Sequence, residues 1–436
     1  MAQPVNPPRG MRDFLPADKA RREHALGIIK SVYRSHGFDE IETPVVEDYA
    51  RLHAGLGGDN EKLSFSILKR GIRPESLAAA AEAGDAEQLA DLGLRFDLTV
   101  PLTRFYASHR AELPPVFRSI QIAPVWRAER PQKGRYRQFV QADIDIIGEA
   151  GLLAEIELIT ATSQALAALG LAGCVIRVND RRILFGLLEH CGFPAETHDR
   201  ALITIDKLDK IGASGVVEEL REIDAAGAER IGSVLAAVEP LLGADGSGAG
   251  IALTREAIAA VLPEGAAEAG VDNLAALGDA LAGSLPEGVS VQFDPTLVRG
   301  MGYYTGTIFE VAHPGSGSSV GGGGRYDGMV GRFLGQDVPA VGFSIGFERV
   351  VDLIELPETT GPESVALIAD ADVELADLVA LKRELVSRGH RVRLEKRQKN
   401  MKTLLARVAE EGFSSVANVR AGVSDADALE FRSLAD

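Results

Sequence analysis

The sequence predicts an α+β fold, and three observations point to it. Residues 117–148 (FRSIQIAPVWRAERPQKGRYRQFVQADIDIIG) carry two apolar stretches around a basic loop, which is typical of an antiparallel hairpin. Residues 175–288 begin with a short strand pattern and are then mostly helical and rich in alanine. Residues 363–436 alternate strand and helix, as in a small α/β domain with parallel crossovers. We therefore expect an antiparallel sheet flanked by helices, a helical insertion and a small C-terminal α/β domain.

Composition limits the classes of protein to which the chain can belong. Its 436 residues are 46% hydrophobic and 25% charged, so it can bury large cores in two or three domains. The formal net charge of -17 argues against a general nucleic-acid-binding protein, but it allows local basic patches that hold RNA. Cys174 and Cys191 have neither zinc-site nor disulfide-framework spacing. We see no apolar signal core and no stretch of membrane-spanning length, so we expect a soluble cytoplasmic protein.

The predicted hairpin has one polar face and one apolar face. Arg127 and Glu129 share a face of its first strand, and Gln141, Asp143 and Asp145 share a face of its second. Fixed arginines suit a polyphosphate, and nearby carboxylates suit a cationic or hydrogen-bond-donating ligand. A solvated hairpin with ion pairs is the alternative that these residues alone leave open.

Periodicity, glycine and proline predict the elements before the hairpin. Residues 17–36 have an apolar stripe at helical spacing and stop at Gly37. The strand FDEIETP that follows ends at Pro44, which suits a sheet edge because proline cannot donate to a neighbouring strand. Residues 71–92 are rich in alanine and glutamate, and we expect them to be helical.

Residues 94–101 (LRFDLTVP) alternate in the way of a half-buried strand. Arg95, Asp97 and Thr99 would share one face of that strand, with the apolar residues on the other. A carboxylate and a hydroxyl two residues apart can hold an ammonium group through charge-assisted hydrogen bonds. A half-exposed strand without a ligand is the alternative.

Three further motifs follow the insertion. Residues 296–312 (TLVRGMGYYTGTIFEVA) place an arginine close to two tyrosines. Residues 321–328 (GGGGRYDG) contain glycines that would let a ligand approach the backbone, although glycine runs also mark turns. Residues 340–354 (AVGFSIGFERVVDLI) predict a strand that passes into a helix with Arg349 in its first turn. A helix N-terminus combined with an arginine can bind an anion.

These motifs resemble those of the histidyl-tRNA synthetase family, in the same order and over nearly the whole chain. RAERPQKGRYRQF resembles the second signature of class II aminoacyl-tRNA synthetases, and residues 340–354 resemble the third. LRFDLTVP is similar to the segment beside the substrate in archaeal and eukaryotic members, and ALITIDKLDKIG is similar to part of the family's insertion. RGMGYYTG is similar to the family's RGLDYYTG, with Gly302 in place of the usual aspartate.

The resemblance implies an enzyme that activates histidine with ATP and transfers it to the 3′ end of tRNA(His). Histidyl-adenylate would be the intermediate, and Mg²⁺ would bridge the phosphates of ATP. It also implies a homodimer, because the equivalents of the helix at 17–36 and of the strand ending at Pro44 build the dimer interface in class II synthetases.

The same resemblance assigns site residues by role. Those implied for catalysis are Arg299 and Arg127. Those implied for ATP are Arg127, Glu129, Arg135 and Arg349. Those implied for histidine are Asp97, Thr99, Gln141, Asp145, Tyr303 and Tyr304. Those implied for the acceptor end of the tRNA are Arg130, Gln132 and Lys133. Asp145 and Tyr304 would grip the two imidazole nitrogens, one of which donates and one of which accepts.

The expected domains follow from the same reading. Residues 1–174 and 289–356 would form the catalytic domain, residues 175–288 the insertion, and residues 363–436 a shortened anticodon-binding-like domain. Between residues 381 and 407 there are ten Lys or Arg and two Glu residues, a net charge of +8, which suits a polyanion. A solvated helical face is the alternative reading of that basic run.

Two other functions remain open on the sequence. One is a non-catalytic regulatory paralogue that partners a phosphoribosyltransferase, although such paralogues typically lack the terminal domain and lose the ATP arginines. The other is a ligase of the same chemistry that loads a different amino acid or a different carrier. Gly302 and the short terminal domain are its support.

Overall fold

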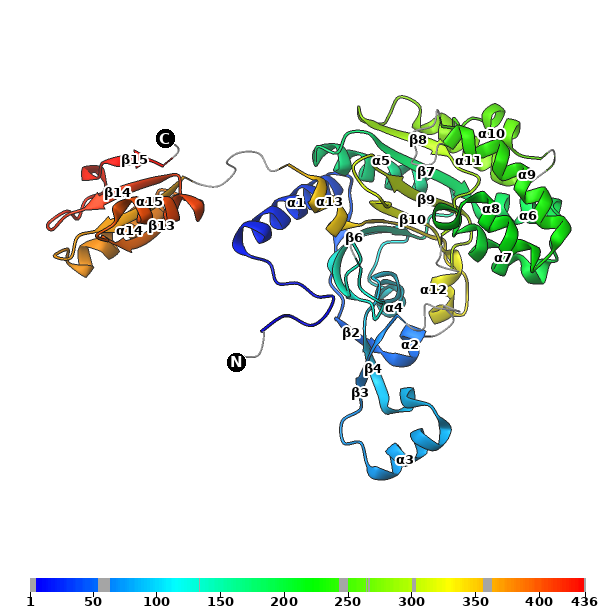
Figure 1. Ribbon diagram of the computed structural model, residues 1–436, viewed down its shortest axis with the longest axis horizontal. Helices are drawn as coiled ribbons and strands as arrows, with labels where there is room; N and C mark the ends of the chain where they lie inside the picture. Colours follow the sequence, from blue (N-terminus) through cyan, green and yellow to red (C-terminus); the bar gives the residue numbers. More distant parts are fainter. Residues whose placement is uncertain are drawn as a thin grey trace. The chain divides into compact units, whose positions relative to one another are not determined.

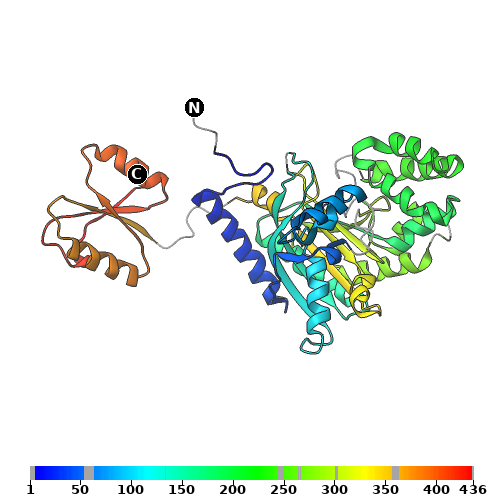
Figure 2. The same cartoon turned by 90° about the horizontal axis from the view of Figure 1, so that it is seen from below.

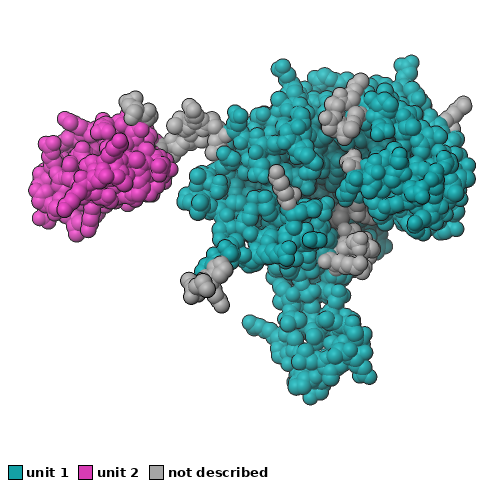
Figure 3. All heavy atoms as spheres, viewed as in Figure 1, with its two compact units in different colours: residues 1–355 teal, residues 356–436 magenta. Residues whose placement is uncertain are grey.

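An eight-stranded sheet forms the centre of the first of two units in the computed structural model (Figures 1 and 3). The units comprise residues 1–355 and 356–436, and we describe each by itself. The structure describes residues 5–53, 63–132, 134–242, 250–263, 265, 267–299, 303–355 and 363–434. None of the helices in these ranges is long and apolar enough to cross a membrane.

The order of the central sheet is β1-β5-β6-β11-β10-β9-β7-β8. Its strands are β1 (Asp39–Glu40), β5 (Phe117–Trp126), β6 (Gln138–Ile147), β11 (Ala340–Ile345), β10 (Gly321–Arg325), β9 (Thr307–Ala312), β7 (Cys174–Asp180) and β8 (Val289–Phe293). Neighbours from β5 to β7 are antiparallel, whereas the two outer strands β1 and β8 pair in parallel. The expected hairpin is confirmed as β5 and β6. The expected edge strand is confirmed as β1, although it ends at Glu40 and not at Pro44.

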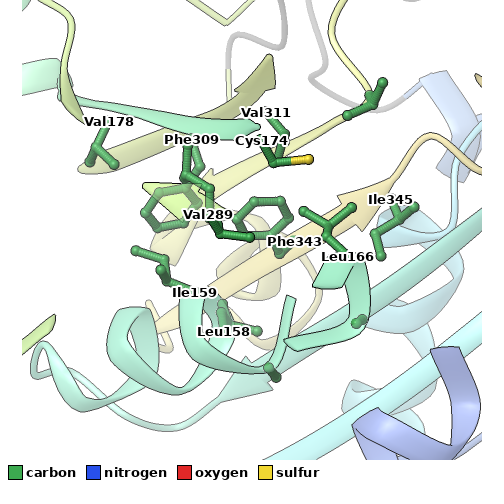
Figure 4. Close-up of a cluster of buried hydrophobic side chains, with 14 of the residues drawn as sticks. Leu158, Ile159, Leu166, Cys174, Val178, Val289, Phe309, Val311, Phe343 and Ile345 are labelled. Atoms are coloured by element: carbon green, nitrogen blue, oxygen red, sulfur yellow. The ribbon is translucent and has the colours of Figure 1, made fainter. Parts of the chain in front are cut away.

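One face of the sheet is covered by α1 (Pro16–Ser35) and α5 (Leu153–Ala168). Figure 4 shows Leu158 and Leu166 of α5 in one buried cluster with Phe309 and Phe343, whose rings stack at 5.4 Å between centroids. Ile144 of β6 belongs to the same buried core. The apolar alternation of β6 therefore faces the helices, and its polar alternation faces the other side of the sheet. The helix expected at 17–36 is confirmed as α1.

Residues 94–101 are not the strand that the alternation predicts. β4 (Ala90–Leu94) ends at Leu94, and α4 (Thr99–His109) begins at Thr99. The carboxylate of Asp97 accepts a hydrogen bond from the backbone N–H of Val100 at 3.2 Å, which favours the turn into the helix. The buried Arg95 guanidinium donates to the carbonyls of Thr43 and Pro124 at 2.8 and 3.0 Å. The alternation of apolar and polar residues at 94–101 therefore arises from a buried connection after β4 and from the first turn of α4.

A second, three-stranded sheet of order β2-β4-β3 forms an arm that carries α3 (Figure 1). Its other elements are β2 (Val46–Asp48), α2 (Tyr49–His53), β3 (Phe65–Leu68) and α3 (Pro74–Ala83). Residues 71–92 were expected to be helical, but only α3 is an α-helix. A short 3-10 turn at Ala86–Leu89 follows, in which Asp85 accepts from the N–H of Glu87, and the chain then enters β4.

The segment between β7 and β8 is mostly helical. It contains α6 (Arg181–His190), α7 (His198–Ile205), α8 (Leu208–Arg221), α9 (Ala225–Leu242), α10 (Arg255–Val261) and α11 (Glu268–Leu281). The expected domain boundary at residue 175 falls inside β7, which pairs with β9 in the central sheet. Two short helices, α12 (Asp327–Leu334) and α13 (Phe347–Leu353), follow β10 and β11.

The second unit is a four-stranded sheet of order β13-β12-β14-β15 with a helix on each face (Figure 2). Its elements are β12 (Ser364–Ala369), α14 (Leu375–Ser387), β13 (Arg391–Lys396), α15 (Met401–Glu410), β14 (Ser415–Val419) and β15 (Phe431–Ser433). β12 is parallel to β13 and β14, so the expected crossovers are confirmed. β15 adds an antiparallel edge, which the alternation did not predict.

We predict that Gly323→Ala destabilises the first unit. A Cβ at this position would lie 1.9 Å from the carbonyl oxygen of Gly342, so the two central strands would have to separate. The free energy of unfolding should fall by about 1–3 kcal/mol, as for other overpacked sites. Chemical denaturation measures it, with Gly328→Ala as the matched control because nothing lies within 4 Å of a Cβ there. Equal stability of the two variants would contradict the prediction.

Candidate functional site

A cavity of about 260 Å³ opens on the polar face of the central sheet. It lies over β6, β10 and β11 and is bordered by the loop after β5 and by residues that precede β9. Every residue that the sequence assigns to ATP or to histidine lines it, namely Asp97, Thr99, Arg127, Glu129, Arg135, Gln141, Asp145, Arg299, Tyr303, Tyr304 and Arg349. Segments far apart in the chain thus meet at one site.

Glycines form the floor of the cavity. A Cβ on Gly322 would lie 2.9 Å from the guanidinium carbon of Arg299, and a Cβ on Gly342 would lie 2.0 Å from Oδ1 of Asp145. A Cβ on Gly324 would lie 2.8 Å from the ring of Tyr304. The glycine run therefore serves to let these side chains lie close against the sheet.

One end of the cavity pairs a carboxylate with tyrosines. The hydroxyl of Tyr326 donates to Oδ1 of Asp145 at 2.6 Å, and both residues are buried. Burial raises the pKa of Asp145 to about 7, and the Tyr326 hydrogen bond opposes that rise. The rings of Tyr303 and Tyr304 lie beside it, with their centroids 4.8 Å apart. Tyr326 was not assigned from the sequence, where its signal was only its place after the glycine run.

Two more carboxyl groups, those of Asp97 and Asp143, lie at the floor of the cavity near Asp145. Burial raises the pKa of Asp97 to about 6. The pKa of Asp143 is raised well above its ordinary value, first by burial and then by the neighbouring Asp145. Gln141 lies on the same face of β6, and its amide nitrogen is 3.4 Å from Oδ2 of Asp143. Buried acids of this kind suit a ligand that is cationic or that donates hydrogen bonds.

Arginines line the remaining wall. Arg299 pairs with Glu310 at 2.6 Å, and Nε of Arg127 donates to the carbonyl of Phe96 at 3.0 Å. These contacts orient both guanidinium groups. The charge of Arg127 is not neutralised, because its partner is a backbone carbonyl. Nε of Arg299 has no hydrogen-bond partner in the described residues.

The outer arginines repel one another. Burial lowers the pKa of Arg349, and the charge of Arg135 lowers it further. Arg349 donates to the carbonyl oxygen of Ser319, and Arg135 pairs with Glu129 at 3.1 Å. Several cations at one wall can neutralise a polyphosphate.

Glu348 is a lining residue that the sequence did not indicate. Its buried carboxylate accepts two hydrogen bonds from Arg22 of α1, at 2.6 and 2.8 Å, and one from the backbone N–H of Val140 at 3.0 Å. It also pairs with Arg12. This cluster joins α1 and β6 to α13, the helix that carries Arg349. Long-range ion pairs of this kind leave no pattern in a sequence.

Two of the residues expected to meet tRNA lie outside the cavity. Arg130 and Gln132 are exposed in the loop between β5 and β6 and do not line it. Lys133 and Gly302 lie outside the described residues.

Comparison with known proteins fits this geometry. The family described as Histidyl-tRNA synthetase matches residues 10–350. The chain is 66% identical over 436 residues to the histidine–tRNA ligase of Leifsonia xyli subsp. xyli, and the match covers 100% of both chains. The chain belongs to the histidyl-tRNA synthetase family. The family membership and the fold class that the sequence predicted are therefore confirmed.

Solved structures share the fold of this histidyl-tRNA synthetase family member. Histidyl-tRNA synthetase from Nostoc sp. PCC 7120 matches with a TM-score of 0.75 and 26% identity, over 99% of this chain and 95% of that one. A protein of Bacillus halodurans C described as an ATP phosphoribosyltransferase regulatory subunit/histidyl-tRNA synthetase matches with a TM-score of 0.74 and 21% identity, over 97% and 100%. The second likeness shows the fold alone. This second likeness therefore does not separate an enzyme from a regulatory subunit.

We predict that Asp145 makes the ligand-free protein less stable as pH rises towards 7. Folded Asp145 keeps its proton up to a pKa of about 7, whereas its ordinary value is 3.8. Between these values the folded state binds more protons than the unfolded state, so the free energy of unfolding falls with rising pH. Asp145→Asn should remove up to about 1.4 kcal/mol per pH unit of this fall.

Urea denaturation between pH 5 and pH 7 measures this difference in slope. Asp91→Asn is the control, because Asp91 is exposed on β4. An unchanged slope in Asp145→Asn would show that Asp145 titrates normally in the folded protein.

Proposed function

We propose that this protein is a histidine–tRNA ligase. It activates histidine with ATP, which gives histidyl-adenylate and pyrophosphate, and it transfers the histidyl group to the 3′ end of tRNA(His). The observation that carries this proposal is a single cavity with an acidic, tyrosine-lined end and a wall of arginines. It occurs in a chain that matches a histidine–tRNA ligase from end to end.

In the first step, a carboxylate oxygen of histidine attacks the α-phosphorus of ATP. A carboxyl–phosphate bond forms, and the bond to the pyrophosphate oxygen breaks in line with it. Arg299 and Arg127 stabilise the negative charge that develops on the phosphate oxygens. Their guanidinium groups are already oriented by Glu310 and by the Phe96 carbonyl, so little reorganisation accompanies the reaction.

Histidine is recognised at the acidic end. Asp145, held by Tyr326, accepts from the imidazole N–H, and the hydroxyl of Tyr304 donates to the other ring nitrogen. Asp97 holds the α-amino group, and Thr99, two residues further along the chain, lines the same cavity. The remaining residues assigned to histidine are Gln141 and Tyr303, which line the same end.

ATP lies along the arginine wall. Arg349 and Arg135 bind its outer phosphates, and Glu129 accepts from the adenine amino group. No group of three or more metal-ligating side chains occurs in the described part of the chain. Mg²⁺ is commonly held by substrate phosphates with one or two carboxylates. Glu310, beside Arg299, is the carboxylate that could contribute, and the ion would offset phosphate charge.

In the second step, a hydroxyl of the terminal ribose attacks the acyl carbon, and AMP leaves. Arg130, Gln132 and Lys133 meet the acceptor end of the tRNA, and the basic stretch between residues 381 and 407 contacts the same tRNA elsewhere. We propose a homodimer that uses α1 and the β1 edge, and a cytoplasmic location, where charged tRNA is used.

The regulatory-subunit alternative has less support than the ligase. Arg127, Arg299 and Arg349 are all present and line one cavity, as binding and activating ATP requires. A regulatory role needs no such wall. The alternative of another amino acid or another carrier rested on the short terminal domain and on Gly302, which lies outside the described residues.

We predict that Arg299→Ala lowers histidine-dependent exchange of labelled pyrophosphate into ATP by about 100- to 1000-fold, as for removal of a preorganised charge stabiliser. Arg200→Ala, a variant of an exposed arginine on α7, should exchange like the wild type. Exchange that requires histidine and that is lost only in Arg299→Ala supports the ligase. A folded wild-type protein without exchange would remove the proposal.

Arg130→Ala separates the two steps. Exchange requires no tRNA, so this variant should keep it, whereas aminoacylation of tRNA(His) should need about ten times more tRNA because a charge-assisted contact is lost. Steady-state aminoacylation kinetics measure this change. Unchanged kinetics with tRNA would place the acceptor end away from this loop.

A further inference from the structure

Three buried oxygen atoms at the floor of the cavity lack hydrogen-bond partners within the described residues. They are Oδ2 of Asp97, Oδ1 of Asp143 and Oε1 of Gln141. Asp97 is 2% exposed and Asp143 is 5% exposed, and all three side chains line the cavity. Buried acceptors without partners are rare in folded proteins, so each such atom points to a missing donor.

The other polar atom of each of these three side chains already has a hydrogen-bond partner, and this contact fixes the position of the atom without one. The other oxygen of Asp97 accepts from the N–H of Val100 at 3.2 Å. The other oxygen of Asp143 is 3.4 Å from the amide nitrogen of Gln141, which also donates to the Ser344 hydroxyl at 3.3 Å. Ser344 lies directly opposite Asp143 on β11. The protein thus holds these side chains in place and leaves one acceptor on each.

The carboxylates at the floor of the cavity repel one another, and a bound cation would reduce this repulsion. Burial raises the pKa of Asp143, and the charges of Asp145 and Asp97 raise it further. A hydrogen bond from Ser344 opposes this rise, and Arg127 is the cation that opposes it. Arg127 faces the acids but donates its Nε–H to a backbone carbonyl. A buried cationic ligand would therefore relieve repulsion that the protein leaves uncompensated.

We propose that Asp143 is a binding residue for the α-ammonium group of histidine and completes a three-acceptor subsite with Asp97 and Gln141. An ammonium group has three N–H donors, and the floor offers three open acceptors. Two of the acceptors belong to carboxylates, so the hydrogen bonds are charge-assisted. This inference rests on the proposed function and adds Asp143, to which the sequence assigned no role.

The subsite makes the amino group a requirement for binding. 3-(Imidazol-4-yl)propionate keeps the imidazole and the carboxylate of histidine but has no ammonium group. It would leave the acceptors of Asp97 and Asp143 buried and unpaired, and sites of this type reject ligands that lack the expected donor. Wild-type protein should therefore bind histidine at least about 100-fold more tightly than this analogue.

Asp143→Asn tests the proposal, because asparagine keeps the size and one carbonyl oxygen but removes the charge. Calorimetric titration of the full chain should show histidine affinity reduced about 10- to 100-fold, with the propionate analogue bound as before or more tightly. In pyrophosphate exchange, KM for histidine should rise by the same factor, with kcat changed much less. Asp91→Asn is the control on the exposed arm.

The possible results separate this proposal from the proposed function. Equal loss of affinity for histidine and for the analogue, or no loss for either, would overturn the role of Asp143. A wild-type protein that binds histidine but shows no exchange would overturn the ligase and leave the binding comparison valid. If Asp143→Asn does not fold, Asp143→Ser removes the same charge and carries the same comparison.

Discussion

The glycines of β10 and β11 are the constraint on which the site depends. Because Gly322, Gly324 and Gly342 have no Cβ, the side chains of Arg299, Tyr304 and Asp145 can lie against the backbone of the sheet. Any side chain on these glycines would occupy the volume that the functional groups now fill. The apolar core on the opposite face, with Phe309 stacked on Phe343, holds the same strands at fixed spacing. Packing on one face thus sets the geometry of the other.

Charge separation along the cavity is the second organising feature. Carboxylates whose pKa values are raised by burial lie at one end, and arginines that are only partly paired lie along the wall. A free amino acid carries a positive and a negative group, and ATP carries several negative ones. In the proposed function, this arrangement would orient both substrates in the same direction, with the amino acid carboxylate brought to the arginines.

Motifs and local patterns in the sequence predicted most of the residues that line the site. The residues that were missed depend on contacts between segments far apart in the chain. Arg127, Asp145 and Arg349 follow from alternation, a helix start and family motifs, and the structure brings them to one cavity. Asp97 lines the same cavity, but the sequence predicted a strand where the structure has a turn, because a capped turn and a strand can show the same alternation. Tyr326 and Glu348 were missed, since their partners are far away in the chain and only the fold brings them together.

The Glu348 cluster has a consequence for handling the protein. Arg12 and Arg22 both pair with this buried carboxylate, and the helix that begins one residue before it carries Arg349. Shortening the chain past Arg12 would weaken the support of the nucleotide wall, and cutting past Arg22 would also leave a buried anion without a counter-ion. Arg12 and the first turns of α1 therefore support the site, and a truncated protein should keep both.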